Sequence, residues 1–224
     1  MKQQELIELV RQHHPRMGVT EIRAKLNRAQ NDFCARTEII KRTYTQLTTA
    51  GKRYYTLDKD IIKILDVQLD DVKIPRLQGN PIIDDDEFDG EAGRNDATSG
   101  STDWYWYVSN ERIGIVEKIA NAITVDNKTS NYQSISVTGK EIRLYTISQA
   151  ADFTTTLTQE SELPIQFREG LAFKVISDGY TLQPMIDINL HQLFYTRYMD
   201  QVKQGRKFAK SNYTSVGNIK PTHF

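Results

Sequence analysis

The sequence contains few of the residues on which catalysis and metal binding depend. Its one cysteine, Cys34, can form neither an intrachain disulfide nor a cysteine-based metal site. Two of its four histidines are the adjacent His13 and His14, whose side chains face different directions and cannot bind one metal together. No HExxH, GxSxG or P-loop pattern occurs. We therefore expect that the protein is not an enzyme and uses no cofactor.

Long apolar runs are also missing from the sequence. No stretch approaches the roughly 18 apolar residues that a membrane-spanning helix needs. The first twenty residues carry charges that exclude a secretory signal peptide, namely Lys2, Glu5, Glu8, Arg11 and Arg16. We expect a soluble protein that is made in a reducing cytoplasm and has no membrane partner.

The charge of the chain is balanced overall but uneven locally. With 29 basic and 29 acidic residues, no global field requires a nucleic acid or a membrane as partner. Residues 201–224 contain five bases and no acid, whereas residues 84–103 contain eight acids and Arg94 as the one base. Such asymmetry between segments is typical of interaction surfaces.

Hydrophobic periodicity divides the chain into helical ends and a β-rich middle. Apolar residues recurring every three or four positions predict helices at 4–12, 20–41, 163–179 and 184–208. Runs of β-branched and aromatic residues predict strands at 43–48, 53–57, 61–69, 104–108, 112–118, 120–125, 132–138, 142–145 and 153–157. This order predicts an α+β fold, in which an antiparallel sheet accompanies a helical bundle.

The predicted organisation has three parts. Residues 1–42 and 163–208 form a helical domain of two N-terminal and two C-terminal helices. Residues 43–162 form an inserted antiparallel β region, in which the glycine-rich, acidic segment 78–103 is a long loop. Residues 209–224 lack any helical or strand period, and we predict that they form an extended C-terminal arm.

The arm is the first candidate contact surface. An unsupported terminus of this kind frays in an isolated subunit, so we expect another chain to hold it. Its apolar residues are spaced singly and serve as anchors, while nearby lysines supply charge. The predicted contact residues are Lys207, Lys210, Tyr213, Val216, Ile219, Lys220 and Phe224.

The acidic loop and the aromatic strand after it are the second candidate surface. Loops this long are usually functional or disordered, and we expect a neighbouring subunit or ring to order this one. The acidic run lacks the glycine and the glutamate that an EF-hand calcium loop needs, although a cation site remains an alternative. Alternating aromatics more often fill cores and interfaces than stack on bases or sugars. The predicted contact residues are Asp84, Asp85, Asp86, Phe88, Trp104 and Trp106.

Several segments, taken in order, resemble the head–tail adaptor (connector) proteins of short-tailed bacteriophages. The resemblance covers roughly residues 1–208. It rests on the helix 26–37 with its Asn27-Arg28-Ala29-Gln30 run, the strand pair 51–57 and 61–67, Ile142-Arg143-Leu144-Tyr145, the helix start Leu163-Pro164 with Phe167 and Leu171, and the closing helix 194–207. Thr146 departs from the pattern, because a proline is common there, and the acidic loop is longer than in the family.

The resemblance implies a structural virion protein of the phage neck, made in the host cytoplasm. Members of that family form a ring of identical subunits, commonly a dodecamer, under the portal protein. The ring extends the channel through which the genomic DNA passes and docks tail tube or nozzle proteins. The family has no catalytic set to transfer to this chain. A C-terminal extension in such a ring can reach the portal, which is the role we predict for the arm.

Two other readings of the sequence remain. A nucleic-acid-binding module would use the basic C-terminus and the aromatic strand, and it would bind short DNA with a steep salt dependence. A wall-degrading hydrolase would need a pair of acids in a cleft, and the sequence does not identify such a pair.

Overall fold

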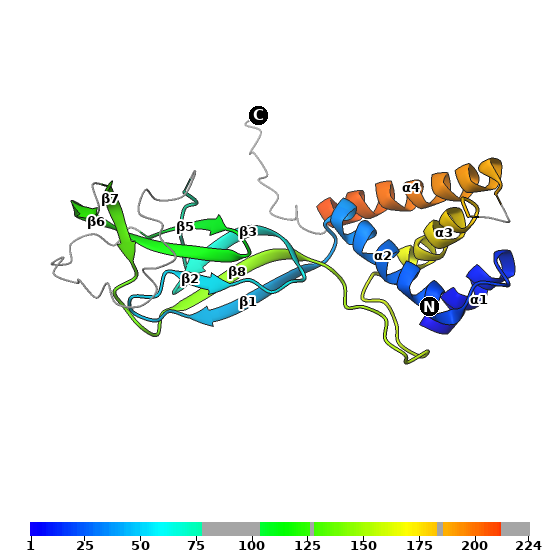
Figure 1. The fold of residues 1–224 in the computed structure, drawn as a ribbon, viewed down its shortest axis with the longest axis horizontal. Helices are drawn as coiled ribbons and strands as arrows, with labels where there is room; N and C mark the ends of the chain where they lie inside the picture. Colours follow the sequence, from blue (N-terminus) through cyan, green and yellow to red (C-terminus); the bar gives the residue numbers. More distant parts are fainter. Residues whose placement is uncertain (78–103, 126–127, 183–185, 212–224) are drawn as a thin grey trace, which may run out of the picture. The chain divides into compact units, whose positions relative to one another are not determined.

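The computed structural model describes residues 1–77, 104–125, 128–182 and 186–211 (Figure 1). The chain divides into a helical unit, residues 1–41 with 147–224, and a β unit, residues 42–146. The predicted α+β class is confirmed, because two N-terminal and two C-terminal helices flank two antiparallel sheets. Residues 147–162 group with the helices.

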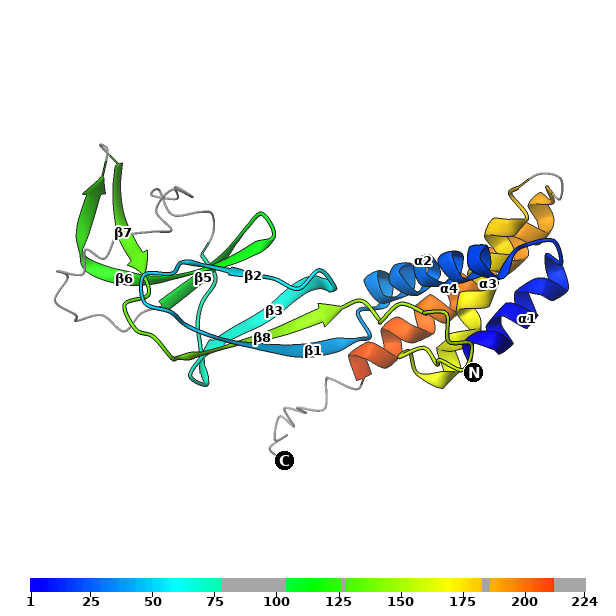
Figure 2. The ribbon, with the colours of Figure 1, turned by 60° about the horizontal axis from the view of Figure 1, so that its bottom comes forward.

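The helical unit contains α1 (Gln3–His13), α2 (Val19–Thr37), α3 (Arg168–Gly179) and α4 (Ile188–Ser211) (Figure 2). A 3-10 turn, Ile165–Phe167, leads into α3. Helix α2 ends four residues before the predicted end, because Glu38 adopts a left-handed conformation with φ of 54°. Helix α4 continues to Ser211, so the first three residues of the predicted arm are helical.

One apolar stripe from each helix builds the core of the helical unit. Phe33 of α2 lies at its centre, with ring centroids 5.8 Å from Phe167 and 6.3 Å from Tyr198. The thiol of Cys34 is buried beside it. Other fully buried members of the core are Leu6, Val10, Ile22, Leu26, Leu171, Val175 and Val202. None of the helices in the described ranges combines the length and apolarity needed to cross a membrane.

The segment that returns from the β unit to α3 is not a strand, so the prediction for 153–157 is wrong. Its polar backbone groups are bound by α2, by the start of α1 and by Gln159 instead of a neighbouring strand. Asn27 accepts from the Phe153 N–H at 2.9 Å and donates to its carbonyl at 3.3 Å. Gln30, fully buried, donates to the Ala151 carbonyl at 2.8 Å and accepts from the Ser161 hydroxyl at 2.6 Å. Contacts with α2 and α1, together with local bonds to Gln159, thus override the β propensity of this segment.

The chain leaves and re-enters the helical unit at neighbouring points. The N–H of Ser148 donates to the carbonyl of Ile40 at 3.0 Å. The outgoing and returning segments are therefore paired at the edge of the unit.

The β unit contains two antiparallel sheets. The first has the order β1-β8-β3-β4, and the second has the order β2-β6-β5 with β7 paired to β6. The strands are β1 (Lys41–Leu47), β2 (Tyr54–Thr56), β3 (Ile61–Leu69), β4 (Val72–Lys73), β5 (Trp104–Ser109), β6 (Arg112–Val125), β7 (Lys128–Ser134) and β8 (Glu141–Ser148).

Three details of the sheets differ from the prediction. Strand β4 was not predicted, and it follows a turn in which Asp70 and Asp71 both have positive φ. The predicted strands 112–118 and 120–125 are one strand, β6, whose register against β7 shifts between Lys118 and Ile123. Strand β7 begins and ends four residues earlier than predicted. Residues of both sheets share one core, which includes Val67, Leu69, Ile113, Ile115, Ile142 and Leu144.

Candidate functional site

The structure describes four of the predicted contact residues. Lys207 and Lys210 lie in the last turns of α4, and Trp104 and Trp106 lie in β5. The other predicted contact residues lie outside the described residues, and these are Asp84, Asp85, Asp86, Phe88, Tyr213, Val216, Ile219, Lys220 and Phe224.

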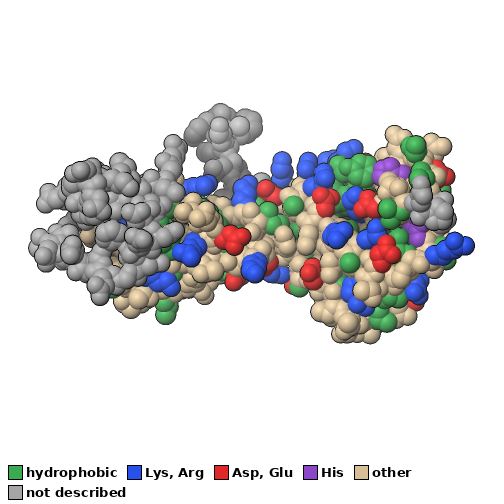
Figure 3. All heavy atoms as spheres, in the orientation of Figure 1, with side chains coloured by type: hydrophobic (Ala, Val, Ile, Leu, Met, Phe, Trp, Pro, Cys, Tyr) green, Lys and Arg blue, Asp and Glu red, His purple; other side chains and the backbone are tan. Residues whose placement is uncertain are grey.

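A basic hollow of about 580 Å³ surrounds the C-terminal ends of α2 and α4. Its lining contains four cations and one acid, and consists of Ala35, Arg36, Thr37, Glu38, Lys41, Arg206, Ala209 and Lys210. Figure 3 shows Lys and Arg side chains gathered over the C-terminal half of α4. The predicted contact residue Lys210 thus belongs to a larger basic surface, whereas Lys207 is exposed beside it.

The hollow exists because α4 passes very close to α2. A Cβ at Gly205 would lie 2.9 Å from both Phe33 and Thr37, so a larger residue would push the helices apart. The next residue, Arg206, donates from Nε to the backbone carbonyl of Arg36 at 2.7 Å. That carbonyl belongs to the last turn of α2, where helix carbonyls lack intrahelical partners. The contact holds Arg206 over the end of α2.

The cations of the hollow differ in how far the chain neutralises them. Nε of Arg36 lies 2.8 Å from both carboxylate oxygens of Asp32, and this hydrogen bond raises the pKa of Arg36. Asp32 also accepts from the Tyr198 hydroxyl at 2.7 Å. Burial lowers the pKa of Lys41, and nearby Glu38 offsets part of the effect. The Lys41 side chain is nevertheless exposed to solvent.

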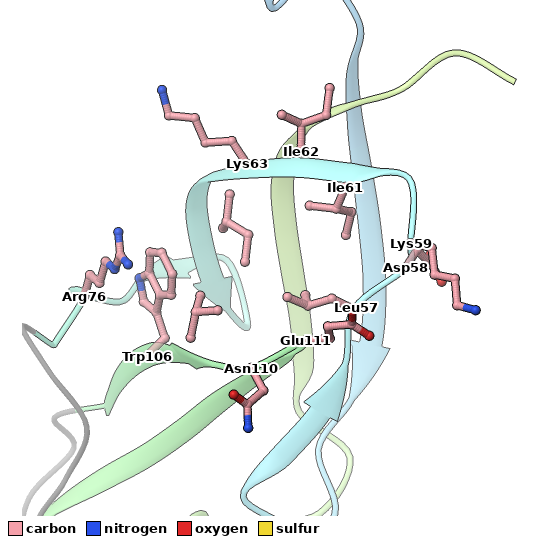
Figure 4. A pocket seen from close by; sticks show the side chains of 12 residues that line it. Leu57, Asp58, Lys59, Ile61, Ile62, Lys63, Arg76, Trp106, Asn110 and Glu111 are labelled. Atoms are coloured by element: carbon pink, nitrogen blue, oxygen red, sulfur yellow. The ribbon is translucent and has the colours of Figure 1, made fainter. Parts of the chain in front are cut away.

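A second hollow, the Trp106 pocket, lies in the β unit and has a volume of about 690 Å³ (Figure 4). Its lining is mixed apolar and charged, and consists of Leu57, Asp58, Lys59, Ile61, Ile62, Lys63, Ile64, Arg76, Trp106, Val108, Asn110 and Glu111. Figure 4 shows Arg76 beside the Trp106 indole, while Lys59 and Lys63 extend away from the pocket.

The two tryptophans of β5 are turned toward the core of the β unit. Trp106 is only 5% exposed, and the Arg76 guanidinium lies 5.2 Å from its ring centroid. Backbone bonds fix this arrangement, because the Trp106 N–H donates to Pro75 at 3.1 Å and the Leu77 N–H donates to Trp106 at 2.8 Å. Trp104 is half-buried against the same core. Neither indole offers a partner a broad open face.

A family model described as SU10 adaptor protein matches residues 1–214. The chain belongs to the SU10 adaptor protein family. The match spans both units and identifies the protein as a phage head–tail adaptor with a structural role. No curated protein sequence matches the chain.

The adaptor contains site residues that the sequence did not single out. Arg36 follows Asp32 by four positions, and this spacing indicates only an ion pair along one helix. Arg36 lies beside Arg206 because α2 and α4 approach closely at Gly205. In the sequence, a single glycine in a helical pattern is only a weak indication of such an approach. Within the described residues, no group of three or more His, Cys, Asp or Glu side chains could hold a metal ion.

Proposed function

We propose that this adaptor is a subunit of a homo-oligomeric ring, commonly a dodecamer in such proteins, beneath the portal vertex in the virion neck. The ring extends the channel for the genomic DNA and docks tail tube or nozzle proteins. The observation that carries the proposal is the family match across both units, from residue 1 to residue 214. The basic end of α4 supports it further, because it provides a charged surface where the chain leads into the arm.

In this proposal the arm binds the portal protein. Because α4 extends to Ser211, the arm consists of residues 212–224, with Lys207 and Lys210 at its base. The arm contains no acid and has four singly spaced apolar anchors, Tyr213, Val216, Ile219 and Phe224. Such spacing suits an extended segment that places successive side chains into pockets of a partner.

Removal of the arm tests this role. A chain that stops at Ser211 is expected to keep its helical circular dichroism and its melting temperature, because the arm adds nothing to the described core. It is expected to lose attachment to portal-containing heads, measured by co-sedimentation. A full-length variant with all four anchors changed to Ser should behave like the truncation.

A matched control keeps the length of the arm and changes four positions between the anchors. The changes are Thr214→Ser, Ser215→Ala, Asn218→Ser and Thr222→Ser. This variant should attach like the unmodified protein. Normal attachment of the truncated chain would refute the role of the arm.

The nucleic-acid alternative draws less support from the structure. Stacking on bases requires an open aromatic face, yet Trp106 is 5% and Tyr107 only 1% exposed. Fluorescence anisotropy with short single-stranded and duplex DNA, at several salt concentrations, compares the two functions. Tight binding that falls steeply with salt would favour the nucleic-acid function.

A further inference from the structure

Strand β1 forms one border of the first sheet. In the order β1-β8-β3-β4 its neighbour is β8, and Figure 1 shows β1 at the lower border of this sheet. An edge strand presents a row of unpaired backbone N–H and C=O groups, to which another chain can add a strand. We therefore ask which groups of β1 are open and what they could bind.

The hydrogen bonds at the two ends of β1 fix its register against β8. The Ser148 N–H donates to the Ile40 carbonyl at 3.0 Å, and the Thr48 N–H donates to the Lys140 carbonyl at 2.8 Å. From Ile40 to Thr48 and from Ser148 to Lys140 the two chains advance by the same number of residues. No bulge therefore interrupts the pairing over these described stretches.

Three residues of β1 consequently direct their backbone groups away from β8, because residues of an antiparallel strand alternate between its two sides. These are Thr43, Thr45 and Leu47, whose side chains are also exposed. Leu47 is 64% exposed although it is a large apolar residue. Within the described residues, no strand or loop binds the backbone groups on this side of β1.

The other border strands of the β unit are less open to pairing, because natural edge strands are commonly short, covered or charged. Strands β4 and β2 contain two and three residues. On the outer side of β5, residues 75–77 bind the Trp106 backbone. Strand β7 is as long as β1, but it begins with Lys128 and has Asn131, a poor strand former, at its centre. Residues 43–47 of β1 include no charge, proline or glycine.

We propose that the open edge of β1 pairs with the same edge of a second copy of this chain. The pairing is antiparallel about a two-fold axis at Thr45. Thr45 then lies opposite the same residue of the second copy, and Thr43 lies opposite Leu47. This register uses all three outward residues, and each opposed pair exchanges two hydrogen bonds. Such an isologous contact closes with two copies and builds no ring, so it describes the adaptor outside the proposed ring.

The edge is suited to a copy of itself. Because residues 43–47 are uncharged, the two-fold contact brings no like charges directly opposite each other over this stretch. Opposed threonines are favourable cross-strand neighbours, and the exposed Leu47 side chain gains contact with the Thr43 methyl group of the second copy. The partner must supply an extended strand of the same length, which β1 itself provides.

Cysteine cross-linking of the full chain tests the pairing and its register. Thr45→Cys places two thiols on opposed residues with a Cα separation of about 5.5 Å, which a disulfide can span. Thr43→Cys is the matched control, because two such thiols would lie about 13 Å apart along the strands. Under mild oxidation, Thr45→Cys should give at least about tenfold more disulfide-linked dimer than Thr43→Cys. Cys34 is buried, and the unmodified chain supplies the background.

Charge substitutions give a second measurement that does not depend on disulfide geometry. Thr45→Lys and Thr45→Glu should each weaken the dimer by about threefold, because like charges then lie directly opposite each other. An equal mixture of the two variants should recover the dimer, since opposite charges meet across the two-fold axis. Sedimentation velocity over a series of concentrations measures both effects. The Thr45 side chain is exposed, so neither substitution should disturb the fold.

Three results would overturn the proposal. These are no disulfide-linked dimer of Thr45→Cys, equal cross-linking of the two cysteine variants, and a Lys–Glu mixture that is no more dimeric than either variant alone. The first result would leave the edge to a strand from a different protein. The measurements need neither portal nor heads, so their failure is distinguishable from failure of the arm to attach the adaptor.

Discussion

The predicted contact residues that the structure describes are exposed in the helical unit but largely buried in the β unit. In the helical unit Lys207 and Lys210 remain exposed at the end of α4, and further cations converge beside Lys210. In the β unit Trp106 is buried in the shared core of the two sheets, and Trp104 packs against it. A lysine rarely leaves the surface, whereas an aromatic residue can fill either a core or an interface. Residue type alone therefore predicts exposure to solvent better for charged residues than for aromatic ones.

The largest expected effect on stability is at Trp106, and it should separate the unfolding of the β unit from that of the helical unit. Trp106→Ala removes a large side chain from the core and should destabilise the β unit by about 3–5 kcal/mol. Both tryptophans of the chain lie in β5, so the remaining Trp104 fluorescence reports on the β unit alone. Urea titration should show early loss of the fluorescence signal, while circular dichroism at 222 nm still reports folded helices. A coincident, unshifted transition in both signals would contradict the buried role of Trp106.

A smaller effect is expected at Gln30, where the helical unit has a buried polar network. Gln30→Ala leaves the Ala151 carbonyl and the Ser161 hydroxyl without their partner, which costs about 1–3 kcal/mol. The loss should appear in the 222 nm transition and leave the fluorescence transition in place. The exposed Gln12 provides a control, since Gln12→Ala should change stability by less than about 0.5 kcal/mol. Equal effects of the two substitutions would argue against the network.

The smallest expected effect is a dependence of stability on pH that differs between the two units. Burial, followed by electrostatic interactions with His14 and Arg197, lowers the pKa of His13 below its usual 6.5. Between the lowered and the usual pKa the unfolded chain binds a proton that the folded chain does not. Stability of the helical unit should therefore fall as the pH drops below about 6.5. Residues 42–146 contain no histidine, so the β unit lacks this source of pH dependence.

Replacing His13 isolates this contribution. His13→Gln should flatten the dependence of the 222 nm urea midpoint on pH between about pH 7.5 and pH 5.5. An unchanged slope would assign the dependence to other groups.

The sequence predicts those features that depend on local pattern. The apolar stripes of α1 to α4 place each helix within a few residues, and the family resemblance agrees with the match over residues 1–214. The segment 153–157 shows where local pattern fails. Asn27, which lies far away in sequence, binds the backbone of Phe153, and Gln30 binds the carbonyl of nearby Ala151. The basic hollow likewise depends on tertiary packing. Arg36 and Arg206 meet because Gly205 removes a side chain from the helix contact.

The hydrogen bond between Ile40 and Ser148 brings together the two ends of the β unit. Two backbones joined by a hydrogen bond lie about 5 Å apart, a gap that a short turn spans. The four helices can therefore be regarded as one bundle into whose connection between α2 and α3 a separate β module has been spliced. A short turn from Ile40 to Ser148 would keep the order of the four helices.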